Sequence, residues 1–124
     1  MMPDILIVDD SEAFREMLKS ILISGFPAMR VREAQDGNRA VQAVETKVPE
    51  LIFLDVRLPD ENGFELTRRL KVAHADVIII MMTSYDSPEY KKAAFDAGTD
   101  FFMSKKTSTP EDILQRIASI FPSG

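Results

Sequence analysis

Residues 51–59 read Leu-Ile-Phe-Leu-Asp-Val-Arg-Leu-Pro, so that Asp55 follows directly after four apolar residues. An ionised carboxylate at the end of a buried strand is costly unless a cation or a reaction requires it there. A second apolar run, residues 5–8, leads in the same way into Asp9 and Asp10. The two runs predict buried strands whose ends share one anionic pocket, and we expect the function to lie in that pocket.

Short apolar runs alternate five times with amphipathic stretches along the chain. Most of the runs are nearly continuous, which is typical of parallel strands covered on both faces. We expect strands at 4–8, 29–34, 51–54, 77–82 and 101–104, and helices at about 14–25, 39–47, 63–72, 88–97 and 109–121. In the first helix Phe14, Met17, Leu18, Ile21 and Leu22 recur at helical spacing. Five strand–helix units in series indicate a single α/β domain with right-handed crossovers.

Polar side chains follow four of the five expected strands. Asp9 and Asp10 follow the first strand, Asp55 the third, Thr83 the fourth and Lys105 the fifth. In an open parallel sheet, ligands bind outside the carboxyl ends of the strands. We therefore expect the acids, the hydroxyl and the amine to converge at one edge of the sheet.

The acidic part of this set favours a magnesium ion. Carboxylates within a few ångströms repel one another, and a hard divalent cation removes that repulsion. Magnesium takes one or two carboxylates together with waters and a phosphate oxygen. With an ammonium and a hydroxyl beside them, the acids match phosphoryl transfer to a carboxylate. Each residue also has a plainer interpretation: Asp10 or Ser11 as a helix cap, Lys105 as a solvated lysine, and Thr83 as a turn hydroxyl bonded to its own backbone.

Length, cysteine content and net charge exclude several classes of function for this protein. The chain has 124 residues, no cysteine and a net charge of −5. These values argue against disulfides, thiol chemistry and direct nucleic-acid binding. The longest apolar run, residues 77–82, is too short to span a membrane, and the N-terminus lacks a signal peptide. We expect a cytoplasmic protein without a membrane partner, and we expect His74 in a solvent-exposed loop away from the pocket.

The chain closely resembles the receiver domain of bacterial two-component response regulators. The resemblance rests on residues 5–11, 33–37, 54–63, 82–84 and 97–105, which occur in the family order and cover nearly the whole chain. It implies a flavodoxin-like parallel sheet of order 2-1-3-4-5 with helices on both faces. It also implies one receiver domain over residues 1–124, with a core of about 3–121 and no output domain in this chain.

The resemblance assigns a role to each residue of the pocket. Asp55 would accept a phosphoryl group from a phosphohistidine. Asp10 and Asp55 would ligate Mg²⁺ directly, Asp9 through a water, and Arg57 through its backbone carbonyl. Lys105 would pair with the phosphoryl group.

A conformational switch is also implied. Thr83 would move toward the phosphoryl group while Phe102 turns inward, and the surface of the fourth helix, fifth strand and fifth helix would change. The alternative is that Phe102 is simply part of the core. The family usually has a proline after the lysine, whereas Lys106 stands here, and we expect a trans peptide bond before it. Arg57 and Tyr85 would flank the approach of water, so we predict a long-lived acyl phosphate.

The expected partners are a sensor histidine kinase or a histidine phosphotransfer protein, and a downstream protein or fused output domain. A homodimer is possible through the face of the fourth and fifth helices. We expect a signalling switch rather than an enzyme. One alternative is a receiver-like interaction module that takes no phosphate. The other is an aspartate-nucleophile phosphatase, which typically has a second aspartate where Arg57 stands.

Overall fold

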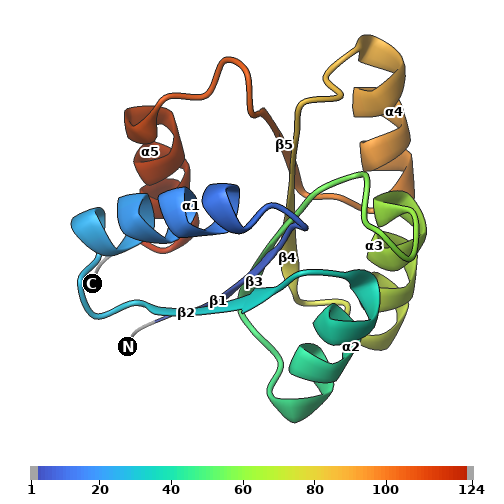
Figure 1. The fold of residues 1–124 in the computed structure, drawn as a ribbon, viewed down its shortest axis with the longest axis horizontal. Helices are drawn as coiled ribbons and strands as arrows, with labels where there is room; N and C mark the ends of the chain where they lie inside the picture. Colours follow the sequence, from blue (N-terminus) through green and yellow to red (C-terminus); the bar gives the residue numbers. More distant parts are fainter. Residues whose placement is uncertain (1–2, 123–124) are drawn as a thin grey trace.

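A five-stranded parallel sheet forms the centre of the computed structural model, which describes residues 3–122 (Figure 1). Its strands are β1 (Asp4–Val8), β2 (Arg30–Ala34), β3 (Leu51–Leu54), β4 (Ile78–Thr83) and β5 (Phe101–Ser104). Its helices are α1 (Glu12–Gly25), α2 (Gly37–Thr46), α3 (Gly63–Ala73), α4 (Pro88–Ala97) and α5 (Pro110–Ile120). The strand order is β2-β1-β3-β4-β5, which confirms the predicted flavodoxin-like fold.

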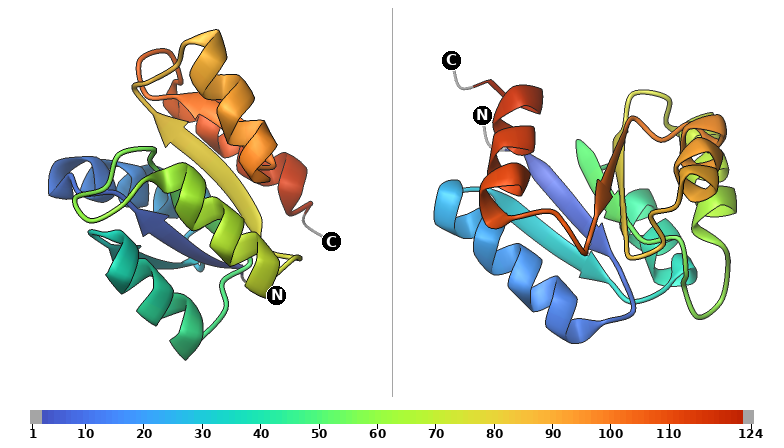
Figure 2. Two further views of the ribbon diagram at one scale, coloured as in Figure 1. Left: turned by 90° about the vertical axis from the view of Figure 1, so that its right-hand side faces the viewer. Right: turned by 90° about the horizontal axis from the view of Figure 1, so that it is seen from above.

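Helices cover both faces of the sheet, as Figure 2 shows. Alternate residues of β1 point to opposite faces, so that Ile5 and Ile7 pack with α1 and α5, whereas Leu6 and Val8 pack with α2, α3 and α4. All five β1 residues are buried. This two-sided burial explains why β1 and β3 appear in the sequence as continuous apolar runs, whereas the edge strand β2, which has the sequence RVREA, has only one buried residue.

The predicted elements differ from the structure mainly at their ends. The fourth strand begins and ends one residue later than predicted, and Thr83 is its last residue because it pairs with Ser104 of β5. The second helix begins at Gly37, two residues early, because Asp36 caps it. Met17 lies in α1, in agreement with its helical spacing, but it is 49% exposed and so lies outside the buried face of that helix.

The cap of α1 is Ser11, whose hydroxyl accepts from the Phe14 N–H at 3.1 Å. The helix therefore begins directly after the acidic pair, and Asp10 is exposed. Within residues 3–122, no helix has the length and apolar character needed to cross a bilayer.

Candidate functional site

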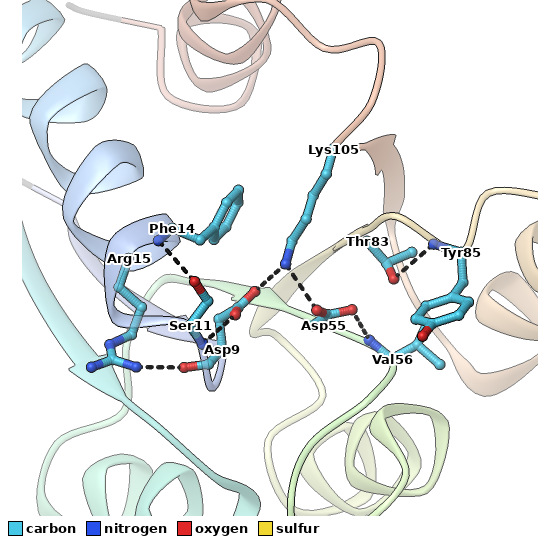
Figure 3. A network of polar contacts seen from close by, with 9 residues as sticks. All are labelled: Asp9, Ser11, Phe14, Arg15, Asp55, Val56, Thr83, Tyr85 and Lys105. Carbon is cyan, nitrogen blue, oxygen red and sulfur yellow. Dashed lines mark hydrogen bonds and ion pairs between the residues drawn. The ribbon is translucent and has the colours of Figure 1, made fainter.

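Lys105 joins two carboxylates at the carboxyl ends of β1 and β3. Its Nζ lies 2.6 Å from Asp9 Oδ2 and 2.9 Å from Asp55 Oδ2 (Figure 3). Asp9 is 1% exposed and Asp55 is 8% exposed. Three residues from separate strand ends thus form one buried ion cluster, as the sequence predicted for this edge of the sheet.

Burial and charge oppose each other in this cluster. Burial raises the pKa of Asp9 above its usual value, although the hydrogen bond from Lys105 and the one from the Ser11 backbone act against this. Burial alone would lower the pKa of Lys105, but its bonds to Asp9 and Asp55 outweigh that effect and raise the pKa. The ammonium therefore keeps its charge and balances the two acids.

The donor chemistry of the pocket suits a hard cation. Two buried carboxylates already need a positive group between them, and Lys105 supplies it in this structure. Oxygen ligands of this kind are the ones that Mg²⁺ prefers. Within residues 3–122, however, no three acidic or histidine side chains are arranged as a ready metal site. Asp10 is exposed at the rim, so its carboxylate does not join the Asp9–Asp55 cluster here.

The backbone of Asp9 is held by Arg15, a residue that the sequence analysis missed. A guanidinium N–H of Arg15 donates to the Asp9 carbonyl at 2.8 Å, and its Nε pairs with Glu33 at 2.9 Å. The Ser11 N–H donates to Asp9 Oδ1 at 2.9 Å. The sequence did contain a signal for this contact, because Arg15 is a charged residue within an apolar helical pattern, six residues after Asp9.

Thr83 lies fully buried at the end of β4, beside the strand that leads to Lys105. Its hydroxyl accepts from the Tyr85 N–H at 3.2 Å, which is the plainer of the two interpretations of this residue. Its carbonyl accepts from the Lys105 N–H at 2.9 Å. The backbones that carry the hydroxyl and the amine are therefore directly linked.

Arg57 and Tyr85 meet at the rim of the pocket. The Arg57 guanidinium carbon lies 4.3 Å from the centroid of the Tyr85 ring, a cation–π contact. The Tyr85 ring is 5.5 Å from that of Tyr90 on α4, which is 6.2 Å from that of Phe64 on α3. A chain of neighbouring rings, tilted toward one another, thus leads from Arg57 to the α3–α4 interface.

Lys105, and not Lys106, faces the acids. No peptide bond within residues 3–122 is cis, so the predicted trans bond before Lys106 is confirmed. The Lys106 N–H donates to Ser104 Oγ at 3.1 Å, and that hydroxyl donates to Asp86 Oδ2 at 2.6 Å. The Ser104 bond lowers the pKa of Asp86. These three residues join the loop after β4 to the loop after β5.

Phe102 is partly buried and packs against the core cluster on the α2–α3–α4 side of the sheet. It also lines a groove of about 610 Å³ between β5, α4 and α5, together with Lys91 and Arg116. Its position therefore combines core packing with contact to this surface groove.

The loop after Asp55 is fixed by two contacts that the sequence did not reveal. Asp60 accepts from the backbone N–H groups of Gly37 and Asn38 at 2.8 and 2.9 Å, and these bonds lower its pKa. Gly63 approaches the backbone of Asp55 so closely that a Cβ atom there would lie 2.2 Å from the Asp55 carbonyl oxygen. His74 caps the end of α3 and lies in the connection to β4, as predicted, but it is partly buried rather than solvent-exposed.

Comparison with known proteins places this arrangement in a family. The family model of the response regulator receiver domain matches residues 5–118. The chain belongs to the response regulator receiver family. Members of this family are phosphorylation-dependent signalling switches of two-component systems, and they generally bind Mg²⁺ at an acidic pocket.

Individual relatives agree with this assignment. The chain is 34% identical over 116 residues to the response regulator MprA of Mycolicibacterium vanbaalenii, an alignment that covers 94% of this chain and 49% of MprA. The chain thus spans about half the length of this relative.

Solved receiver structures have the same fold. A CheY-like receiver domain protein from Methanospirillum hungatei superposes with a TM-score of 0.87 and 30% identity, covering 97% of this chain and 94% of that one. The BeF3-activated receiver domain of DrrB gives a TM-score of 0.88 and 26% identity, covering 99% and 100%.

Proposed function

We propose that Asp55 of this receiver accepts a phosphoryl group from a phosphohistidine on a sensor histidine kinase or a histidine phosphotransfer protein. The phosphorus–nitrogen bond breaks while a bond forms between phosphorus and an Asp55 carboxylate oxygen, and the imidazole leaves. The observation that carries the proposal is the partly buried Lys105 ammonium between the buried carboxylates of Asp9 and Asp55. It supplies a fixed positive charge where the negative phosphoryl oxygens would arrive.

Magnesium would be held by Asp10 and Asp55 directly, by Asp9 through a water and by the backbone carbonyl of Arg57. When bound, the ion neutralises charge on the phosphoryl oxygens. Asp9 and Asp55 suit this role by their buried oxygen donors, and Asp10 by its place next to Asp9 at the rim. Lys105 would then pair with the phosphoryl group instead of with both carboxylates.

The phosphorylated state would be read through Thr83 and Phe102. The Thr83 hydroxyl would exchange its bond to the Tyr85 N–H for one to the phosphoryl group, and Phe102 would turn further inward. Both changes would alter the groove formed by α4, β5 and α5. This surface would control a downstream protein or a fused output domain in the cytoplasm, with a homodimer through the same face as one form of the output.

The proposal is tested by incubating the protein with acetyl phosphate and Mg²⁺ and measuring the intact mass. We expect the addition of one PO₃ group, located at Asp55 by peptide mapping and absent from Asp55→Asn. The control is Asp96→Asn, because Asp96 pairs only with exposed Lys92 on α4.

Beryllofluoride provides a second measurement. Beryllofluoride with Mg²⁺ should shift amide resonances around Thr83 and Phe102, in line with the BeF3-activated DrrB relative. A protein that neither gains mass nor responds to beryllofluoride would instead be a phosphate-independent interaction module.

A further inference from the structure

A phenylalanine ring covers the side of the Lys105 ammonium that the two carboxylates leave open. Lys105 Nζ lies 4.1 Å from the centroid of the Phe14 ring, and Figure 3 shows the ring beside the lysine. We propose that Phe14 is a positioning residue for phosphoryl transfer, whose ring face holds the Lys105 ammonium in the pocket through a cation–π contact. The inference rests on the proposed function of Asp55 and assigns a residue that acts through Lys105.

Lys105 needs such a contact because its side chain is long and flexible. The backbone of Lys105 is held by the hydrogen bond from its N–H to the Thr83 carbonyl. Four methylene groups, however, separate this backbone from the ammonium. At rest, Asp9 and Asp55 hold the ammonium. Once a cation and a phosphoryl group occupy these carboxylates, the ring is a contact that the ligands do not compete for. It therefore limits the space that the ammonium searches during the reaction.

The ring is itself well fixed. Phe14 lies in the first turn of α1, where its N–H donates to the capping hydroxyl of Ser11. Its side chain packs against the core cluster that includes Leu18 and Ile113. Asp9, Asp10 and Phe14 thus belong to one short segment that leads into α1. This segment determines the position of the ring relative to the acids.

Packing alone offers a competing explanation, because any apolar side chain at position 14 fills space against the core. The two roles differ in what they require of the ring. Packing requires shape, whereas a cation–π contact requires negative charge on the ring face. Fluorine atoms on the ring withdraw that charge and change the shape little. Fluorinated phenylalanines therefore distinguish a packing role from a cation–π role.

The test is to replace Phe14 with mono-, tri- and pentafluorophenylalanine and to measure the rate of phosphorylation by acetyl phosphate with Mg²⁺. We expect the rate to fall stepwise with fluorine content, by about fivefold for the pentafluoro ring. Phe14→Trp should keep the rate, and Phe14→Leu should lower it. The control is pentafluorophenylalanine at Phe26, which packs against the same cluster at the other end of α1.

Thermal unfolding of each variant shows whether the core is intact, and the monofluoro ring keeps the comparison valid if the pentafluoro variant does not fold. Equal rates across the folded members of the series would overturn the role of Phe14 while leaving the proposed function in place. A wild-type protein that takes no phosphate at Asp55 would overturn both. A stepwise loss at Phe14 without a loss at Phe26 would establish the cation–π contact as part of the reaction.

Discussion

The guanidinium group of Arg57 lies over the face of the Tyr85 ring, with 4.3 Å between the guanidinium carbon and the ring centroid. The two side chains come from loops after different strands, β3 and β4. The contact brings an exposed arginine and a partly buried tyrosine together at a position two residues after Asp55 in the chain. Two such side chains would hinder the approach of a water molecule to a phosphoryl group on Asp55, which is the physical reason for the predicted slow hydrolysis.

We predict that Arg57→Ala combined with Tyr85→Ala accelerates hydrolysis of the acyl phosphate about tenfold, which corresponds to ~1.4 kcal/mol in the barrier. The alanine at position 57 keeps the backbone carbonyl that Mg²⁺ would use. Decay of phosphorylated protein after removal of acetyl phosphate gives the rate. Arg68→Ala serves as the control, since Arg68 pairs with Glu65 on α3. An unchanged decay in the double variant would show that the rim does not shield the site.

A second prediction concerns the charge on Asp9. Burial raises the pKa of Asp9, so the charged form of this acid is less favourable in the folded protein than in the unfolded chain. Stability that depends on Asp9 is therefore present below about pH 3.8 and is lost as the pH rises through the raised pKa. At neutral pH, Asp9→Asn removes this cost, and we expect a higher midpoint of thermal unfolding without Mg²⁺.

Magnesium should make wild-type protein more stable than Asp9→Asn, the opposite of the order expected without Mg²⁺. A ligand that binds only the folded state stabilises it by ~2.7 kcal/mol at one hundred times its Kd. Wild-type protein should gain stability with increasing Mg²⁺, whereas Asp9→Asn should gain much less. Unfolding curves at several Mg²⁺ concentrations check both statements, with Asp96→Asn expected to behave as wild type. If Asp9→Asn unfolded at a lower temperature than wild type without Mg²⁺, the buried charge of Asp9 would not destabilise the folded protein, and the prediction would be wrong.

The third prediction concerns the Asp86–Ser104 hydrogen bond. It lowers the pKa of Asp86 below the usual 3.8, so its contribution to stability is present above pH 3.8 and is lost as the pH falls through the lowered value. Ser104→Ala should thus be less stable than wild type at neutral pH, and the difference should shrink in strong acid. Denaturant titrations at both pH values measure this. A difference that is independent of pH would mean that Asp86 contributes nothing through Ser104.

The fourth prediction tests the approach of Gly63 to the Asp55 backbone. Gly63→Ala puts a Cβ atom 2.2 Å from the Asp55 carbonyl oxygen and 2.9 Å from the Val56 Cα. These are backbone atoms that cannot move aside cheaply, so we expect destabilisation by about 1–3 kcal/mol, measured by denaturant unfolding, together with slower phosphorylation. In Gly25→Ala the new atom meets only the flexible end of Leu114. That control should unfold much closer to wild type.

The sequence was sufficient to predict the strands and the edge of the sheet at which the pocket lies. Parallel strands buried on both faces leave continuous apolar runs, and the polar residues that end them must share one edge of the sheet. Asp9, Asp55 and Lys105 were found in this way although Lys105 lies 96 residues from Asp9.

Other contacts have no local signature. The ring of Phe14 has the same helical spacing as exposed Met17, and only the packing of α1 against the sheet and α5 separates them. Asp60 accepts from backbone N–H groups 22 and 23 residues away, and a backbone group carries no sequence signal. Such contacts depend on how elements meet in three dimensions, which a pattern within one element does not encode.

The hydrogen bond from the Lys106 N–H has a practical consequence for protein engineering. Proline, which the family resemblance leads us to expect at this position, carries no N–H and could not donate to Ser104. A consensus substitution at position 106 would therefore remove a donor on which the Ser104–Asp86 link depends. We therefore expect Lys106→Pro to weaken the connection between the loops after β4 and β5 rather than to stabilise the protein.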